Sequence, residues 1–183
     1  KVYFAHEGGV NRVAFLPDGL QLASAGSDKS LRVVATATWR KLYVLEGHGA
    51  SVMTLACAAD GTLLAAADAA GEVRLWEPAT GLAVARFRAC PGEVDAVAFS
   101  PDGRRLVTGG IDAQVVFWDV DALLSPGAAA GGAAGRGGVV RCWIEFGAAD
   151  ARIAQAAVRR FATMAVDGRD GSAALAFVRD RLR

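Results

Sequence analysis

The stretch that decides the fold is residues 94–120, which read VDAVAFSPDGRRLVTGGIDAQVVFWDV. Three runs of alternating apolar residues are separated by Pro101-Asp102-Gly103 and by Gly109-Gly110-Ile111-Asp112, both of which are typical turn sequences. Alternation with a period of two, interrupted by such short turns, predicts three antiparallel strands that follow one another in a meander. The same pattern occurs twice more, nearer the N-terminus.

The pattern recurs at a fixed spacing of 42 residues: segments 10–19, 52–61 and 94–103 align without gaps. The predicted strands are 10–15, 20–25, 31–35 and 40–45 in the first copy, 52–57, 62–67, 72–77 and 82–88 in the second, and 94–99, 104–109 and 114–119 in the third. A single sheet of this size leaves both faces uncovered, so the copies are expected to stack. A period of about 42 residues with four strands is typical of a β-propeller blade.

Several short motifs coincide at fixed places in the repeat. Gly47-His48 precedes a first strand, Pro-Asp-Gly fills first turns, an Asp lies in second turns, and Trp76 and Trp118-Asp119 end third strands. These residues resemble WD40 repeats over residues 1 to about 120. The resemblance implies an all-β fold, a partial WD40-type β-propeller of about three to four four-stranded blades.

In the WD40 family, a His, a Ser or Thr, an Asp and a Trp of one blade form a buried chain of hydrogen bonds. Such buried polar groups are tolerated because each is given a partner. The resemblance assigns this structural role to His6, Ser24 and Asp28 in the first copy, His48 and Trp76 in the second, and Thr108, Asp112 and Trp118 in the third. The remaining places hold Val34, Ala66, Ala70 and Cys90, so no copy is complete. Apolar packing can replace such a network at little net cost, so the predicted fold stands.

The repeat divides the chain into five predicted segments: 1–5 as the outer strand of a preceding or closing blade, 6–46 as blade 1, 47–88 as blade 2, 89–146 as blade 3 with a Gly/Ala-rich insertion at 125–138, and 147–183 as a degenerate blade 4. The insertion is low in complexity and lacks the spacing of a phosphate or dinucleotide loop, so it reads as a linker. Residues 139–146 are predicted as the displaced outer strand of blade 3. Residues 150–164 fit either a short helix or a strand at 153–158, and the repeat favours the strand.

The chain begins at Lys1, without an initiator Met or a signal-like segment, so it is expected to be an excerpt of a longer protein. Three ways of completing a ring are open. The longer chain supplies more blades, residues 2–4 close a small ring against the C-terminal strands, or another subunit completes it.

Composition and cysteine use narrow the class of protein. Hydrophobic residues make up 53% of the chain and charged residues 21%, with a net charge of +1. The apolar runs are too short to cross a membrane, and no dense basic run suggests a nucleic-acid footprint. The three cysteines, Cys57, Cys90 and Cys142, lie far apart, which favours a reducing compartment over a disulfide framework or a zinc site. An intracellular, cytoplasmic location is predicted, with the nucleus as an alternative.

The sequence offers no catalytic constellation. Its only histidines, His6 and His48, fall on the structural position of the repeat. The aspartates of the Asp-Gly turns are explained by turn geometry. We therefore expect no enzyme activity, no metal site and no cofactor.

The family resemblance implies that partners bind the rim formed by the loops before the first strand and between the second and third strands. Three positions per blade carried over from the family are Gly9, Asn11 and Ser27, then Ser51, Met53 and Ala69, then Glu93, Asp95 and Ile111. The candidate partner-binding residues among them are Asn11, Ser27, Ser51, Met53, Glu93, Asp95 and Ile111. Apolar Met53 and Ile111 beside acidic Glu93 and Asp95 suit a protein or peptide with basic residues.

The predicted function is a non-enzymatic WD40 scaffold that mediates protein–protein interactions in a multiprotein complex, with proteins or peptides as partners and neither a small-molecule substrate nor a membrane. One alternative is a propeller region that serves a catalytic domain elsewhere in a longer chain. The other is a weak nucleic-acid-binding module that uses the arginines between Arg152 and Arg183.

Overall fold

A computed structural model of the chain describes residues 6–125 and 139–140. These residues form three antiparallel sheets of four strands, here called blades 1, 2 and 3. Blade 1 contains β1 (Val10–Phe15), β2 (Gln21–Gly26), β3 (Leu31–Ala35) and β4 (Lys41–Leu45). Blade 2 contains β5 (Val52–Cys57), β6 (Leu64–Asp68), β7 (Glu72–Glu77) and β8 (Leu82–Arg88). Blade 3 contains β9 (Val94–Phe99), β10 (Arg105–Gly110), β11 (Val115–Asp119) and β12 (Val139–Val140).

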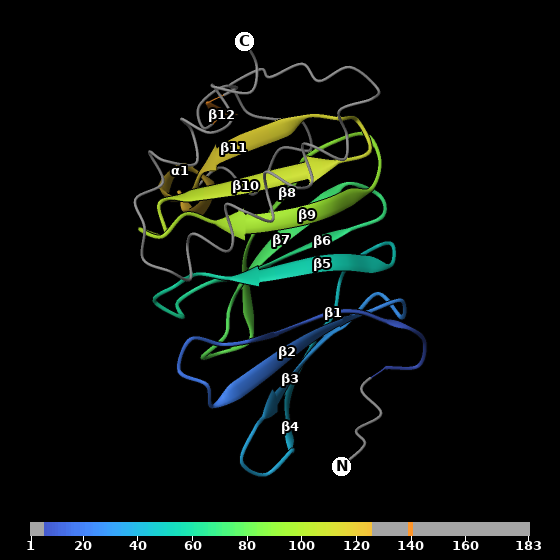
Figure 1. The fold of residues 1–183 in the computed structure, drawn as a ribbon, viewed down its shortest axis with the longest axis vertical. Helices are drawn as coiled ribbons and strands as arrows, with labels where there is room; N and C mark the ends of the chain where they lie inside the picture. The colour runs from blue at the N-terminus through green and yellow to red at the C-terminus, as the bar shows by residue number, and fades with distance from the viewer. Residues whose placement is uncertain (1–5, 126–138, 141–183) are drawn as a thin grey trace.

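The three blades fan out from their first strands. Figure 1 shows β1, β5 and β9 lying side by side, with the other strands of each blade spreading away from them. β5 packs against β1 and β2 of the preceding blade, and β9 packs against β5 and β6 in the same way. The predicted all-β, partial propeller fold is therefore confirmed, and the limits of β1 to β11 lie within two residues of those predicted.

The core consists of the two interfaces between blades. Side chains alternate along each strand, so a central blade buries one set of apolar residues on each face. The interface between blades 1 and 2 joins Ala23, Ala25, Leu31 and Val33 to Val52, Leu55, Leu64 and Trp76. The interface between blades 2 and 3 joins Ala65, Ala67, Val73 and Leu75 to Val94, Val97, Leu106 and Trp118. In both interfaces the alanines lie on the second strand of one blade and face larger side chains of the next.

Two features lie at the end of the third blade. A short helix that the sequence analysis did not predict, α1 (Val120–Leu124), begins after Asp119, whose side chain accepts a hydrogen bond from the Ala122 N–H. β12 pairs with β11 and corresponds to the first two residues of the predicted outer strand at 139–146. Residues 1–5, most of the insertion, and the region of the degenerate blade and the possible helix at 150–164 lie outside the described residues.

The described cysteines are free thiols: Cys90 is buried and Cys57 is half-buried. Burial, together with the charges of Asp60 and Asp18, raises the pKa of Cys57 to about 12, and burial also raises the pKa of Cys90. In residues 6–125 and 139–140, no helix has both the length and the apolar character needed to cross a membrane.

Candidate functional site

The first strand of each blade contains a β-bulge at the same position. In β1, Asn11 is the extra residue, because Val10 pairs with Gly26 while Arg12 pairs with Ala25. The same shift makes Met53 the extra residue of β5 and Asp95 the extra residue of β9. A bulge turns a side chain out of the alternation of its strand, and bulges are over-represented at sheet edges, at the rims of barrels and next to active sites. The three blades therefore present one redirected side chain each at equivalent places.

One backbone hydrogen bond per blade holds the loop between the second and third strands against the segment that precedes the first strand. The N–H donates to the carbonyl in three equivalent pairs: Ser27 to Gly9 at 2.9 Å, Ala69 to Ser51 at 2.9 Å, and Ile111 to Glu93 at 3.1 Å. The two residues of each pair and the bulge residue of the same blade make up one set. The three sets are the positions that the family resemblance selected. We call them together the loop rim: Gly9, Asn11, Ser27, Ser51, Met53, Ala69, Glu93, Asp95 and Ile111.

Asn11 connects the loop rim of blade 1 to that of blade 2. Its side-chain amide donates to the carbonyl of Val52 at 2.8 Å and to the hydroxyl of Ser51 at 3.0 Å. The same nitrogen lies 3.9 Å from the sulfur of Met53, and the amide oxygen accepts from the Ser27 hydroxyl at 3.5 Å. The structure thus brings four of the predicted residues into one polar cluster. All of them remain at least partly exposed, so a partner can reach them.

Blade 3 contributes an acidic pair and an exposed apolar side chain to the loop rim. Burial raises the pKa of Glu93, and the hydrogen bond and negative charge of Asp95 raise it further. Ile111 is 65% exposed, and its Cδ1 would lie 2.6 Å from a Cβ added to Gly92, so this side chain lies across the glycine. Because β5 packs on β9, the bulges of Met53 and Asp95 lie on neighbouring strands. The loop rim therefore changes from polar in blade 1 to acidic and apolar in blade 3.

A buried polar network ties the loop before β1 to the sheet of blade 1. The Nε2 of His6 lies 2.8 Å from the Ser24 hydroxyl, and its Nδ1 lies 2.9 Å from the Asp28 carboxylate. Burial alone would raise the pKa of Asp28, but hydrogen bonds from Ser30, from His6 and from the backbone N–H of Glu7 outweigh burial and hold this pKa well below its usual range. A Ser-His-Asp chain can be catalytic. Here Ser24 and the His6 ring are buried, so the network serves to hold the loop.

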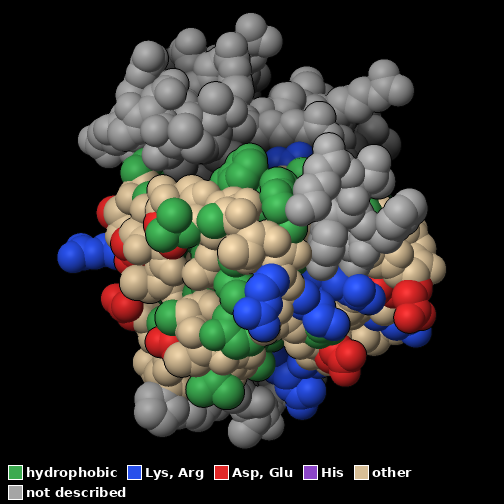
Figure 2. Space-filling model, turned by 90° about the horizontal axis from the view of Figure 1, so that it is seen from below, with side chains coloured by type: hydrophobic (Ala, Val, Ile, Leu, Met, Phe, Trp, Pro, Cys, Tyr) green, Lys and Arg blue, Asp and Glu red, His purple; other side chains and the backbone are tan. Residues whose placement is uncertain are grey.

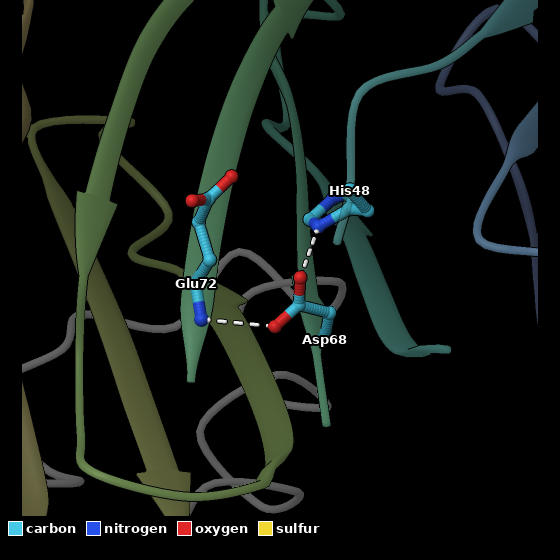
Figure 3. Close-up of side chains that lie close together, drawn as sticks. All are labelled: His48, Asp68 and Glu72. Atoms are coloured by element: carbon cyan, nitrogen blue, oxygen red, sulfur yellow. Dashed lines mark hydrogen bonds and ion pairs between the residues drawn. The ribbon is translucent and has the colours of Figure 1, made fainter. Parts of the chain in front are cut away.

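In blade 2 the carboxylate comes from a different position. The repeat places Ala70 where blade 1 has Asp28, so the alignment assigned no carboxylate partner to His48. In the structure, Asp68 accepts a hydrogen bond from the Nδ1 of His48 at 2.9 Å (Figure 3). Its other oxygen accepts from the backbone N–H groups of Ala70 at 2.9 Å and Glu72 at 3.0 Å. Asp68 therefore joins the predicted structural residues His48 and Trp76.

The move of the carboxylate follows from the space at the end of the second strand. Positions Gly26, Asp68 and Gly110 are equivalent in the three blades. A Cβ added to Gly26 would lie 2.2 Å from His6 and 2.6 Å from Asp28, and one added to Gly110 would lie 2.3 Å from the Glu93 carbonyl. With Ala70 in place of an aspartate, blade 2 has room for a side chain at this position. The room is filled by the carboxylate that His48 requires.

The side chains of His48, Asp68 and Glu72 also form the one group among the described residues whose composition could hold a metal ion, with ligand atoms within 4.8 Å of one another. Their contacts argue for a structural role. Figure 3 shows that Asp68 is reached both by His48 and by the backbone N–H of Glu72, so both of its oxygens already accept hydrogen bonds. The Glu72 carboxylate accepts from the guanidinium of Arg74, whose positive charge also disfavours a nearby cation.

Blade 3 keeps only separate parts of the network. The indole N–H of Trp118 donates to the Thr108 hydroxyl at 2.9 Å, and its ring packs against Phe87 with centroids 4.4 Å apart. Cys90, at the His position, donates its thiol to the Gly92 carbonyl at 2.9 Å instead. Asp112 stays within its own turn and accepts from the Gln114 N–H at 3.1 Å.

Sequence analysis did not predict two features of these sites, namely the role of Asp68 in the buried network and the bulges in the first strands. Asp68 was missed because the repeats were matched at equal offsets, although an Asp two residues before an Ala at the expected position was a usable signal. The bulges were missed because alternation around Asn11, Met53 and Asp95 is broken by only one residue in each strand.

Comparison with known proteins agrees with this architecture. A family model described as "WD domain, G-beta repeat" matches residues 1–34, 39–77 and 82–119. Eukaryotic translation initiation factor 3 subunit I from Pyricularia oryzae is 32% identical over 130 residues, which cover 66% of this chain and 38% of that protein. Apoptotic protease-activating factor 1 from Homo sapiens is 29% identical over 128 residues, which cover 66% of this chain and 10% of that protein.

Solved structures show the same likeness. The crystal structure of the RRP9 WD40 repeats and the structure of U3-55K each match with a TM-score of 0.65 at 25% identity. Each match covers 67% of this chain and 39% of the other chain, so the chain spans well under half the length of these relatives. The family model covers more than half of the chain and coincides with the three blades, and the chain therefore belongs to the WD40 repeat family.

Proposed function

We propose that the chain is a non-catalytic WD40 scaffold whose loop rim binds a protein or peptide that carries a basic residue beside apolar ones. The observation that carries this proposal is the repeated bulge, which redirects Asn11, Met53 and Asp95 at equivalent points of three neighbouring blades. The relatives support a role in assemblies in general terms, since one of them is by its name a subunit of a translation initiation factor. The free thiols fit a partner inside the cell, in the cytoplasm or the nucleus.

The charge of the loop rim selects the basic residue. The carboxylates of Glu93 and Asp95 repel each other, and burial together with this neighbouring negative charge raises the pKa of Glu93. A Lys or Arg of a partner would relieve this repulsion and form charge-assisted hydrogen bonds. Met53 and Ile111 flank the pair with a flexible thioether and an exposed branched side chain, which suit apolar neighbours of that basic residue.

A catalytic or nucleic-acid function has less support from the described residues. Both histidines, His6 and His48, are held in buried networks with aspartates. The arginine-containing segment 152–183, on which nucleic-acid binding would depend, lies outside the described residues. A catalytic domain elsewhere in a longer chain would be compatible with a scaffold here.

The proposal is tested by removing the loop rim side chains without touching the core. We expect the triple variant Met53→Ala, Asp95→Ala, Ile111→Ala to lose proteins that co-purify with the complete protein from its own cells. The matched control replaces three exposed leucines away from the loop rim, Leu20, Leu82 and Leu124, with alanine. The control should retain those proteins, as quantified by mass spectrometry.

Thermal unfolding separates binding from folding. Both triple variants should melt close to the unaltered protein, because surface substitutions are usually within about 0.5 kcal/mol. Equal loss of partners from the two variants, or a large drop in melting temperature confined to the loop rim variant, would refute the proposal. A further check is the charge: Glu93→Gln with Asp95→Asn should weaken binding and reduce its dependence on salt.

A further inference from the structure

The outer strand of blade 2, β8, buries the side chains of one side and exposes those of the other. Ala85 is 7% exposed, and Phe87 packs its ring against Trp118 of blade 3. Arg86 and Arg88 alternate with these two residues and are exposed. Because side chains alternate along a strand, the two arginines lie on the side of blade 2 that is turned toward blade 1.

The neighbouring strand adds a third arginine to this side. In the register between β7 and β8, Arg74 lies directly opposite Arg86, and Glu72 lies opposite Arg88. Like charges directly opposite each other on neighbouring strands destabilise a sheet. Glu72 accepts a hydrogen bond from the guanidinium of Arg74 and compensates one of the three positive charges. Within residues 6–125 and 139–140, no carboxylate lies at ion-pair distance from Arg86 or Arg88.

Backbone groups hold two of the three guanidinium groups in place. That of Arg74 lies against Gly47 in the loop before β5, since a Cβ added to this glycine would lie 2.4 Å from the Nη1 of the arginine. Arg88 donates from Nε to the Cys90 carbonyl at 3.3 Å and from Nη2 to the Pro91 carbonyl at 3.1 Å. Side chains that are already held lose less conformational freedom when a ligand binds. We call the three arginines of β7 and β8 the arginine face.

Blade 2 alone among the three described blades has this set of charges. In blade 1, Val44 and Glu46 stand at the positions of the two β8 arginines, and Arg32, the equivalent of the β7 arginine, is paired with Asp28. In blade 3, Val116 stands at the position of the β7 arginine. The repeat therefore does not require the positive charges, which favours a role in recognition.

An exposed apolar side chain adjoins the arginine face. β8 contains a bulge at Val84, because its pairing with β7 passes from Ala83 to Ala85. Val84 is 38% exposed and precedes Arg86 by two residues. Figure 2 shows Lys and Arg side chains gathered next to hydrophobic ones in the view from below, the direction in which blade 1 and the adjoining side of blade 2 lie in Figure 1.

We propose that the arginine face, together with Val84, binds an acidic segment of a partner protein in which Asp or Glu residues alternate with apolar ones. Carboxylates form charge-assisted, bidentate hydrogen bonds with guanidinium groups, and they relieve the repulsion between Arg74 and Arg86. This surface lies on the outer strands of blade 2. It is distinct from the loop rim, which is built on the first strands and for which a basic partner is proposed above.

Charge distinguishes this partner from two other occupants. Residues 139–183 of the same chain carry 8 Arg against 5 Asp and Glu, so their net charge has the same sign as the arginine face. Residues 6–125 carry 10 Lys and Arg against 14 Asp and Glu, and Glu72 lies within the face itself. A nucleic acid, whose affinity depends on neutralising many phosphates, is disfavoured by this negative balance. A short acidic segment needs only the local positive charge.

Fluorescence anisotropy with the complete protein, expressed from its own gene, tests the arginine face. The probe is a short labelled peptide in which glutamate alternates with valine. A peptide with lysine in place of each glutamate and a labelled thymidine oligonucleotide are the comparison probes. The variant is Arg86→Glu, and its matched control is Arg104→Glu, a charge reversal at an exposed position of blade 3.

The unaltered protein is expected to bind the glutamate peptide, more weakly as salt is added. Arg86→Glu should bind this peptide about tenfold or more weakly, whereas Arg104→Glu should bind it as the unaltered protein does. The melting temperature of Arg86→Glu should be no lower than that of the unaltered protein, because the substitution places a carboxylate opposite Arg74. The loop rim variants should still bind the glutamate peptide, so the two proposals are tested separately.

Four outcomes would overturn the proposal. They are no measurable binding of the glutamate peptide to the unaltered protein, equal binding of the lysine peptide, equal loss in Arg86→Glu and Arg104→Glu, and a lower melting temperature of Arg86→Glu with unchanged peptide binding. An oligonucleotide that binds more tightly than the glutamate peptide, and that Arg86→Glu no longer binds, would assign the face to a nucleic acid and also overturn it.

Discussion

Blades 1 and 2 each pair a buried histidine with an aspartate, but the aspartate lies at a different position of the repeat in each blade. In blade 1, His6 is paired with Asp28, which lies in the turn after the second strand and keeps some contact with water. In blade 2, His48 is paired with Asp68, the last residue of the second strand, which is completely buried. Both aspartates also accept backbone N–H groups of the turn that follows the second strand. Both pairs therefore hold the turn after the second strand, one partly exposed to water and the other completely buried.

The difference shows that the hydrogen bond between histidine and aspartate is kept in both blades although the aspartate occupies different positions of the repeat. A glycine at the end of the second strand leaves room for the ring of His6 and the carboxylate of Asp28. When the turn aspartate becomes Ala70, the strand end can hold the carboxylate itself, and the His remains satisfied at Nδ1. This arrangement leaves the other ring nitrogen of His48, the buried Nε2, without a hydrogen bond among the described residues, because Ala66 stands where blade 1 has Ser24.

The largest expected effect is on the tryptophan that blade 2 has and blade 1 lacks. Trp76 is buried and packs against His48 with ring centroids 5.4 Å apart, whereas blade 1 has Val34 at this place. Replacing Trp76 with alanine should lower the free energy of unfolding by about 3–5 kcal/mol. Val34→Ala should cost about 2 kcal/mol or less, since it removes only two methyl groups. Urea unfolding of both variants measures the difference, and equal losses would mean that Trp76 does not organise its interface.

The second effect compares the two carboxylates. Asp68→Ala leaves His48 and two backbone N–H groups without a buried acceptor, and about 3 kcal/mol of stability should be lost. Asp28→Ala should cost less, about 1–2 kcal/mol, because water can reach some of the freed groups. The measurement is again urea unfolding at neutral pH. A larger loss for Asp28→Ala would show that partial exposure does not lower the value of this network.

The sequence predicts features that follow from the periodicity of the backbone better than it predicts contacts between side chains in space. The blades followed from alternation and a spacing of 42 residues, because both are imposed by the backbone and repeat three times. Asp68 did not follow, because a contact in space can be made from two places in the sequence. The helix after Asp119 was also missed: its signal is a single capping residue directly after a strand.

In the loop rim, too, the sequence predicted some features and not others. The equal offsets of Gly9, Ser51 and Glu93 placed the predicted residues in equivalent loops, and the structure brings Asn11, Ser27, Ser51 and Met53 into one cluster. The bulge that redirects Asn11 depends on the register between two strands, which a strand pattern alone does not specify. Under the proposed function, the identity of a partner at the loop rim would depend on side chains of another molecule, and the sequence constrains only their charge and polarity.

The third effect is a dependence of stability on pH that belongs to blade 2. Burial lowers the pKa of His48 below its ordinary value of 6.5 and outweighs the opposing effect of Asp68. The unfolded chain therefore binds a proton near pH 6.5 that the folded chain does not bind, so stability should fall as the pH drops below about 6.5. The slope from one such group is at most about 1.4 kcal/mol per pH unit.

His48→Gln isolates this contribution. The free energy of unfolding is measured in urea at several pH values from 7.5 downwards for the variant and the unaltered protein. Between the ordinary pKa of His48, 6.5, and the region where carboxylates titrate, the variant should show the flatter profile. A steeper profile for the variant, or stability that rises in the unaltered protein as pH falls, would mean that the Asp68 charge dominates over burial.

The smallest effect, and the one that tests the comparison most directly, is to give blade 2 the hydroxyl that blade 1 already has. In blade 1 the Ser24 hydroxyl lies 2.8 Å from the Nε2 of His6, and Ala66 is the equivalent residue beside His48. Ala66→Ser should supply a donor to the unpartnered Nε2 of His48 and raise the free energy of unfolding by about 1 kcal/mol.

Ala65→Ser is the matched control, because Ala65 is equally buried but faces the apolar interface with blade 3. There the new hydroxyl finds no ring nitrogen, and burying it should cost about 1 kcal/mol or more. Opposite signs for two neighbouring Ala→Ser changes would show that the gain at Ala66 comes from the histidine rather than from serine itself. If both variants lose stability, the Nε2 of His48 is already satisfied by other means, and blades 1 and 2 differ less than their hydrogen bonds indicate.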